Sequence, residues 1–444
     1  MANTMESSSA GSEKKCRICI VNEFFYPDNA GGTGSVLSDL TRTLRQNHPE
    51  LQIDVIASCN LYRDKDVVLP ALEDWDGVAI HRVRVPHAGG SSTLMRLLLN
   101  SLFGCLSLGM LLRISSPPFD MLLIGTAPPT LAMAASLYKL LTGTPYTYII
   151  YDLDPDRAIR MGVITERSLF AKLLRALQLG WLSRASKIVV LGRCMRDYIS
   201  ETYRIPRSKF EVIPIGADPA EIVPLIRATR LRERCRLSGF VVSYSGNFGR
   251  YHNFDTMLDA AKRLLAMGRD VTFLLIGDGA KKAYVEARIA DERIENVKVM
   301  PFVPKDEYAD SLATADASLV TLEPGMEGLC VPSKFYSILA SGRPVLAMVG
   351  ENSEVAHVLN EAHCGYRIDQ ADVEALVECI IRLADNPAES ERMGRNARRV
   401  LVENYATELV AEKYYNLIVH DMQGTGCPDR GHAPGLLSSV HGKE

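Results

Sequence analysis

The stretch VVSYSGNFGRYHNFDTML, residues 241–258, decides the fold of this chain. It starts with a short β-branched apolar run, turns at Gly246 and Gly249, and continues as a helix whose apolar residues recur with a period of 3.6. A strand, a glycine turn and a helix place free backbone N–H groups where a phosphate can bind. The same pattern also occurs as an ordinary βα connection in α/β proteins, so its function depends on its neighbours.

The composition is that of a globular protein with large cores. The chain has 444 residues, 47% hydrophobic and 23% charged, with a formal net charge of −3. Such a chain has no overall basic field, so we expect no nucleic-acid partner. The ten cysteines are scattered, and only Cys16 and Cys19 have a metal-ligand spacing. This pattern favours reduced thiols in a cytoplasmic protein over zinc sites or disulfides, and we expect no metal site.

The strand–turn–helix pattern recurs along the chain. Residues 17–21 predict a first strand, a glycine-rich loop follows, and residues 35–45 predict a helix. Strands and helices alternate over residues 15–215 and again over 240–404, which predicts parallel sheets covered on both faces. We therefore predict two doubly wound α/β units, joined by a polar linker at residues 216–239.

The two ends of the chain are predicted to lie outside these units. Residues 1–14 are Ser-rich and polar without an apolar signal region, and residues 423–444 are rich in Gly and Pro. Both segments are therefore expected to be disordered. The last predicted helix, residues 405–422, can lie on either unit, including back across the first.

Two predicted helices of the first unit have unusual surfaces. Residues 93–112 are almost entirely apolar, but the uncharged part, 97–112, is shorter than the roughly 20 residues that span a bilayer. This segment fits a core helix, a helix in the plane of a membrane surface, or a true span. Residues 167–183 combine leucines at steps of four with Trp181 and several cations. That pattern is typical of a helix on anionic lipid and also of a core-facing helix with a solvated back.

Seven segments together resemble one enzyme family. They are FFYPDNAGGTG (24–34), DLDPDRAIRMG (152–162), VIPIGAD (212–218), YSGNFGRYHNFDTMLDAA (244–261), LLIGDG (274–279), PFVPKDEYADSLATADASL (301–319) and VPSKFYSILASGRPVLA (331–347). In this order and spacing they resemble the GT-B-fold glycosyltransferases of family 4, also called group 1, which build bacterial exopolysaccharide, O-antigen and colanic-acid-type polymers. The resemblance spans about residues 16–415. It implies two Rossmann-like domains facing across a cleft, with a nucleotide-diphosphate sugar as the donor.

The resemblance implies that the second unit holds the donor. The loop Gly246–His252 and the segment Pro332–Lys334 are the candidate phosphate sites, because each precedes a predicted helix and Lys334 adds a cation. A lysine at a helix start can also be simply solvated. The expected substrate-binding residues of this unit are Gly246, Asn247, Gly249, Arg250, His252, Phe302, Val303, Ser333, Lys334 and Ser337.

Several positions depart from the family pattern. The arginine and lysine of the family's glycine loop correspond to Asn247 and His252, and the second of its two glutamates corresponds to Ser337. Leu329 stands in place of the first glutamate, and the nearby Glu327 is the candidate for its role. The resemblance implies a retaining transfer in which the leaving phosphate accepts the proton of the acceptor. We therefore expect no side-chain nucleophile, no metal and no other cofactor.

The acceptor is expected to bind the first unit. Asp152, Asp154 and Asp156 follow a predicted strand closely enough for like charges to raise one carboxyl pKa and create a proton acceptor. The same residues also fit a turn with a helix cap. The acceptor-side candidates are Gly31, Gly32, Thr33, Gly34, Asp152 and Asp156; with Glu327, the two aspartates are the candidate catalytic residues.

The predicted function is sugar transfer from a nucleotide-diphosphate sugar to a lipid-linked or polysaccharide acceptor. The predicted location is the cytoplasm, with peripheral binding to the inner face of the plasma membrane as an open extension. Two alternatives also remain open. A non-hydrolysing nucleotide-sugar epimerase would carry acid–base residues in both units, and a degenerate transferase would only bind a sugar nucleotide or a partner.

Overall fold

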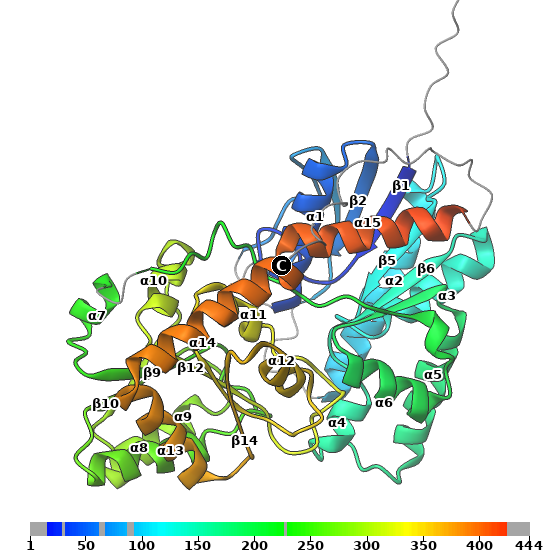
Figure 1. Ribbon diagram of the computed structural model, residues 1–444. Coiled ribbons are helices and arrows are strands. Elements are labelled where there is room, and N and C mark those ends of the chain that lie inside the picture. Colours follow the sequence, from blue (N-terminus) through cyan, green and yellow to red (C-terminus); the bar gives the residue numbers. More distant parts are fainter. Residues whose placement is uncertain (1–15, 29–31, 62–66, 87–92, 226–228, 424–444) are drawn as a thin grey trace, which may run out of the picture.

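The protein consists of two α/β units, each built around one sheet (Figure 1). The computed structural model describes residues 16–28, 32–61, 67–86, 93–225 and 229–423. The expected head, residues 1–14, and residues 424–444 of the expected tail lie outside the described residues. These two units confirm the doubly wound architecture expected from the alternation of strands and helices.

The first unit is built on eight strands in the order β3-β4-β2-β1-β5-β6-β7-β8. All neighbours pair in parallel except β3 and β4, an antiparallel pair at the edge that the sequence analysis did not predict. The central strands β5 and β6 are buried along their whole length, as expected when helices cover both faces. The strands are β1 (Cys16–Val21), β2 (Leu51–Ser58), β3 (Leu72–Trp75), β4 (Val78–Val83), β5 (Met121–Gly125), β6 (Tyr146–Ile150), β7 (Lys187–Val190) and β8 (Phe210–Val212).

The second unit is built on six parallel strands in the order β11-β10-β9-β12-β13-β14. Its first strand, β9, is the apolar run that starts the organising stretch, and it lies at the centre of the sheet. The strands are β9 (Phe240–Ser245), β10 (Val271–Ile276), β11 (Val297–Met300), β12 (Ala317–Thr321), β13 (Val345–Met348) and β14 (Gly365–Ile368).

Helices connect the strands in both units. Those of the first unit are α1 (Gly32–Asn47), α2 (Thr93–Ile114), α3 (Leu131–Thr142), α4 (Asp156–Arg160), α5 (Leu169–Arg184) and α6 (Arg193–Tyr203). Those that follow are α7 (Arg230–Arg234), α8 (Asp255–Ala266), α9 (Lys282–Glu292), α10 (Tyr308–Ala313), α11 (Lys334–Ala340), α12 (Glu354–Ala362), α13 (Val373–Asp385), α14 (Pro387–Val400) and α15 (Thr407–Gln423).

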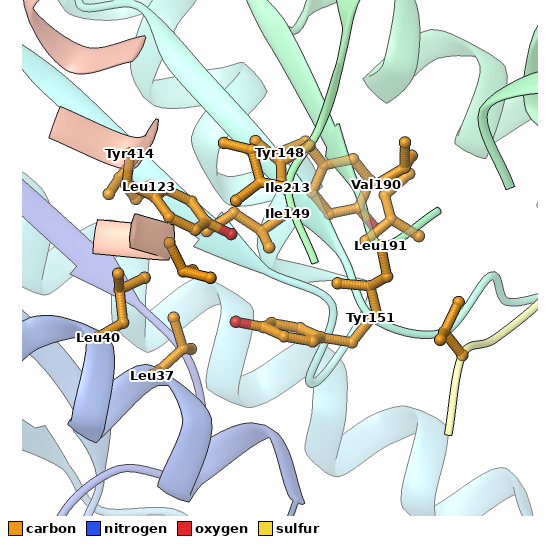
Figure 2. Close-up of a cluster of buried hydrophobic side chains, with 14 of the residues drawn as sticks. Leu37, Leu40, Leu123, Tyr148, Ile149, Tyr151, Val190, Leu191, Ile213 and Tyr414 are labelled. Carbon is orange, nitrogen blue, oxygen red and sulfur yellow. The ribbon is translucent and has the colours of Figure 1, made fainter. Parts of the chain in front are cut away.

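The chain passes between the units twice, and the two passages lie side by side. The Ala217 N–H donates to the Tyr405 carbonyl at 3.0 Å, and the Thr407 N–H donates to the Ala217 carbonyl at 3.2 Å. After this point α15 packs against α1 of the first unit. Figure 2 shows Tyr414 of α15 beside Leu37 and Leu40 of α1 in the core of that unit.

The apolar helix α2 lies on the surface of the first unit. Over Leu97–Ile114 it is long and apolar enough to cross a membrane, by length and composition alone, and only 22% of this segment is buried. The buried residues include Phe103, Ser107 and Leu111, through which α2 packs against α3, β2 and β4. A helix attached to the sheet along one face and exposed along the other is not the core helix that the sequence also allowed.

Candidate functional site

The glycine turn after β9 has a shape that requires glycine. Gly246 has φ +145°, and its N–H donates to the Ile276 carbonyl at 2.9 Å. Gly277 has φ +153°, and a β-carbon there would lie 1.9 Å from the Gly246 carbonyl oxygen. The two turns at the carboxyl ends of β9 and β10 therefore pack backbone against backbone.

The helix after this turn starts where Asn253 can cap it. Helix α8 begins at Asp255, and the Asn253 Oδ1 accepts the Thr256 N–H at 3.1 Å, which satisfies part of the first turn. The loop from Gly246 to His252 can thus offer a ligand its own backbone and side chains, and not the N-terminus of α8. Asn247 and Arg250 are exposed there.

His252 is buried and braces the glycine turn. Its Nδ1 lies 2.9 Å from the Tyr244 hydroxyl oxygen and accepts a hydrogen bond from the Gly249 N–H at 3.2 Å. Burial and the nearby charge of Lys334 lower the pKa of His252 well below its usual value. These contacts are those of a neutral side chain that holds the loop through Nδ1. Substrate binding by His252 stays a prediction.

Lys334 is the most unusual residue of this region. Its ammonium nitrogen is buried, and among the described residues it has no hydrogen-bond partner. The nitrogen lies 3.6 Å from the centre of the Tyr244 ring, and a β-carbon at Gly246 would lie 2.7 Å from it. Burial lowers the pKa of Lys334 well below its usual value. A buried cation without a counter-charge beside a glycine turn is a place where an anion would be stabilised.

Ser333 connects the donor-side segment with the first unit. A β-carbon at Gly32, the first residue of α1, would lie 3.9 Å from the Ser333 Oγ. Of the acceptor-side residues, the structure thus brings Gly32 next to the segment that precedes Lys334. Thr33 and Gly34 follow in the first turn of α1. Gly31 lies outside the described residues.

Ser337 and the residues after β11 lie farther along the second unit. The Ser337 side chain bonds the buried Tyr308 hydroxyl, so Ser337 has a partner within the protein. Phe302 and Val303 are half-buried at the carboxyl side of β11, where Val303 packs on a small core with Met300. These three residues lie on the same unit as Lys334, and Ser337 shares helix α11 with it.

Glu327 lies at the carboxyl ends of β13 and β14. Its Oε1 accepts a hydrogen bond from the Gln370 amide nitrogen at 3.0 Å, and a β-carbon at Gly350 would lie 2.1 Å from the same oxygen. Glycine at 350 is therefore what leaves room for this carboxylate. Glu327 and Lys334 share one edge of the sheet, with Lys334 beside β9 and Glu327 beside β13 and β14.

Asp152 lies where the two units meet. It forms an antiparallel bridge with Cys330, and the Leu153 N–H donates to the Leu329 carbonyl at 2.9 Å. The Arg157 guanidinium reaches Asp152 at 2.5 Å and Asp154 at 2.9 Å. Although burial opposes the charge, these two carboxylates raise the pKa of Arg157. One arginine thus offsets part of the charge of these two carboxylates, and burial together with the charge of Asp152 raises the pKa of Asp154.

Asp156 points into the first unit. Its side chain is only 1% exposed, and its carboxylate accepts hydrogen bonds from the hydroxyls of Tyr203 and Tyr198 and pairs with Arg175 at 2.9 Å. A carboxylate satisfied by three internal partners and shielded from solvent cannot reach an acceptor. We therefore correct the catalytic role expected for Asp156 and assign it a structural one.

An ion-pair cluster that the sequence did not predict joins the units. The Arg193 backbone nitrogen, at the start of α6, donates to Glu354 of α12 at 2.7 Å, and the Arg193 side chain pairs with Glu361 at 2.7 Å. A β-carbon at Gly192 would lie 2.7 Å from the Glu354 side chain. The residues are separated by more than 160 positions in sequence, so only the fold could show this contact.

The described residues contain no group of three or more His, Cys, Asp and Glu side chains placed to hold a metal ion. Two open cavities, of about 750 and 870 Å³, lie away from the residues above. The first is lined by Arg232 and Asp270, and the second by Arg343 and Arg398. Neither cavity is lined by an expected site residue.

Comparisons with known proteins agree with the fold and show the family of this chain. Residues 230–400 match the family model described as glycosyl transferases group 1, and residues 31–216 match the model described as glycosyl transferase 4-like domain. A probable glycosyltransferase of Pseudomonas aeruginosa, WbjE, is 30% identical over 304 residues, which cover 66% of this chain and 73% of that protein.

Solved structures are similar in fold over almost the whole chain. The sucrose-phosphate synthase of Thermosynechococcus elongatus has a TM-score of 0.75 at 16% identity and covers 92% of this chain and 100% of its own. The HepE protein of Anabaena, solved in complex with UDP and glucose, has a TM-score of 0.68 at 13% identity and covers 91% and 100%. At such low identity these likenesses show the fold alone.

Proposed function

Because this chain belongs to the group 1, family-4-type glycosyltransferases of the GT-B fold, we propose that it transfers a sugar from a nucleoside-diphosphate sugar to a lipid-linked or polysaccharide acceptor, with retention at the sugar. Membership of a transferase family argues against an epimerase and against a protein that only binds a sugar nucleotide. The observation that carries the donor assignment is the buried, unpartnered ammonium of Lys334 beside Gly246. We propose that the diphosphate binds there.

This placement gives Lys334 a role in the reaction as well as in binding. Negative charge grows on the leaving diphosphate as the glycosidic bond breaks, and a fixed cation in a water-poor site stabilises that charge more than the ground state. We propose that Lys334 takes the place of the family cations missing at Asn247 and His252. The exposed Arg250 can add a second positive charge from the same loop.

We propose that Glu327 contacts the transferred sugar and that Asp152 lies on the acceptor side. Glu327 is oriented by its bond from Gln370, so its second carboxylate oxygen can accept a sugar hydroxyl. Asp152 stands where the units meet, next to Cys330 on the loop that leads to Lys334. The proton of the acceptor hydroxyl passes to the departing phosphate, so no other nucleophile takes part.

The proposed function predicts covalent transfer without added metal. Purified protein is incubated with radiolabelled UDP-, GDP- or ADP-sugars and a membrane extract of the source organism, with and without EDTA. One donor is expected to label extractable lipid or polymer at the same rate in both conditions. Absence of labelled product with every donor would contradict the proposed function, and loss of labelling with EDTA would contradict metal independence.

A wide apolar surface supports a location at a membrane. Helix α3 contacts both α2 and α5, and all three lie in the first unit (Figure 1). None of the three helices contains Asp or Glu, whereas Arg113, Lys139, Lys172 and Arg184 supply positive charge. The exposed large apolar residues are Met95, Leu98, Leu102, Leu106 and Leu112 on α2, Leu137, Leu140 and Leu141 on α3, and Leu169, Phe170, Leu173, Leu177 and Leu179 on α5. We propose that this surface binds the inner face of the plasma membrane from the cytoplasm.

Replacing two leucines of this surface with aspartate is predicted to release the protein from anionic vesicles. Leu169 and Leu173 are 84% and 56% exposed, so replacing both with Asp should remove apolar contact with lipid while leaving the fold stable. In flotation assays the parent is expected to rise with anionic vesicles at low salt and partly dissociate at high salt, because salt screens surface charge. Met267→Asp, at a 49% exposed position of the second unit, is the matched control. A parent that stays unbound at low salt would refute the membrane assignment.

A further inference from the structure

Glu23 occupies the point where the connections of the first sheet reverse direction. Strand β1 lies between β2 and β5, and the chain winds outward from it to β4 on one side and to β8 on the other. In such sheets, ligands bind at the carboxyl ends of the strands at this reversal. Glu23 follows β1 by two positions, so its backbone stands at this place.

The backbone of Glu23 is fixed by both neighbouring strands. Its N–H donates to the Ala127 carbonyl after β5 at 2.8 Å, and its carbonyl accepts the Ser58 N–H at the end of β2 at 2.9 Å. The same turn packs against the acceptor-side glycines, since a β-carbon at Gly34 would lie 3.1 Å from the Phe24 β-carbon. Glu23 is therefore held rigidly on the loop that leads to Gly32 and, across the units, to Ser333.

The Glu23 side chain is half-buried, and within the described part of the chain its carboxylate has no hydrogen-bond or ion-pair partner. Burial and the nearby Asp28 raise the pKa of Glu23 to about 7. The turn holds a second unsatisfied oxygen, because the fully buried Asn22 Oδ1 also has no partner among the described residues. Unsatisfied polar groups in a protein cost free energy, and a hydroxyl from a ligand would remove this cost at Glu23.

We propose that Glu23 binds the acceptor by accepting a hydrogen bond from one of its sugar hydroxyls. A carboxylate near a second acid repels phosphate but bonds a neutral hydroxyl strongly, so its position fits a hydroxylated acceptor and not the diphosphate of the donor. Lys334, the cation that we propose for the diphosphate, lies on the other unit. The inference rests on the proposed function, and it adds a residue that the sequence patterns did not single out.

The test separates acceptor binding from donor binding. With the donor identified by the labelling assay, transfer is measured against increasing amounts of solubilised membrane extract for the parent, Glu23→Gln and Glu23→Asp. Glu23→Gln keeps a neutral acceptor oxygen but loses the charge, so it is expected to need about 5- to 10-fold more extract for half-maximal transfer, the difference between a hydrogen bond to a charged group and one to a neutral group. Its affinity for the nucleoside diphosphate is expected to match the parent's. Glu23→Asp keeps the carboxylate and is expected to recover part of the loss.

Glu201→Gln serves as the matched control, because Glu201 is an exposed carboxylate on α6 of the same unit. Unchanged extract dependence in Glu23→Gln would overturn the inference while leaving the proposed function intact. Equal loss of nucleotide affinity and transfer in both Glu23 variants would also overturn it, because it would show a structural role. A parent that transfers nothing would refute the proposed function itself, and the inference with it.

Discussion

Replacing Lys334 with methionine is expected to weaken nucleoside-diphosphate binding about 10- to 150-fold, which corresponds to about 1.5–3 kcal/mol for a hydrogen bond to a charged group. The ammonium nitrogen has no acceptor among the described residues and lies against Gly246, where a diphosphate oxygen would supply the missing partner. Methionine keeps the length of the side chain and its packing on Tyr244 but removes the charge. Arg250→Met, at an exposed position on the same loop, is the matched control and should cost less.

The same substitution is expected to stabilise the free protein. Burial lowers the folded-state pKa of Lys334, so between this pKa and the unfolded value the unfolded chain binds a proton that the folded chain lacks. Stability of the parent should therefore rise with pH through that window, and Lys334→Met should lose this rise. At neutral pH, removing the unsatisfied group should raise the unfolding free energy by about 1–3 kcal/mol. A variant that is less stable and binds nucleotide normally would contradict this view of Lys334.

Replacing Asp156 with alanine is expected to cost about 3 kcal/mol of unfolding free energy, near the lower end of the range for breaking a buried ion pair. The loss leaves the buried Tyr203 hydroxyl without its acceptor, while Arg175, 32% exposed, can turn toward water. Asp152→Ala, at a 34% exposed position, should cost less. Denaturant unfolding of both variants measures the difference.

This result decides between a structural and a catalytic Asp156. The structural role predicts that the folded fraction of Asp156→Ala binds nucleotide and transfers sugar as the parent does. Parental stability together with loss of transfer would restore the catalytic role expected from the sequence. The comparison with Asp152→Ala is needed because both residues stand in the same DLDPD segment.

The architecture could be predicted from the sequence because strands and helices each leave a local pattern of apolar residues. Apolar runs such as those of β9 and β10 alternate with helical periods, and parallel sheets are the consequence of that alternation. The short edge strand β3, LEDW, has too little apolar character to be seen in this way. The start of α8 also has a local signal, because Asn253 caps the helix and its Oδ1 accepts the Thr256 N–H.

The site was harder to predict because it depends on burial and on contacts between the units. Sequence showed that Lys334 precedes a helix, but not that its ammonium would be buried on the Tyr244 ring. The spacing of Asp152 and Asp156 suggested one function. The structure instead pairs the Asp152 carboxylate with Arg157 where the units meet and turns the Asp156 carboxylate into the core of the first unit. One sequence signal could have pointed to Glu23. It follows the first strand, and ligands of doubly wound sheets bind at the carboxyl ends of strands.

The most direct test of the account is calorimetric titration of the parent and Lys334→Met with UDP, GDP and ADP at several pH values below about 10.4, the usual lysine pKa, in buffers of different ionisation enthalpy. The account predicts that one nucleotide binds the parent and that the heat varies with the buffer, because the diphosphate raises the lowered pKa of Lys334 and the protein takes up a proton. Lys334→Met should bind more weakly, with that proton uptake lost. Equal affinities and equal proton uptake in the two proteins would contradict the proposed donor site.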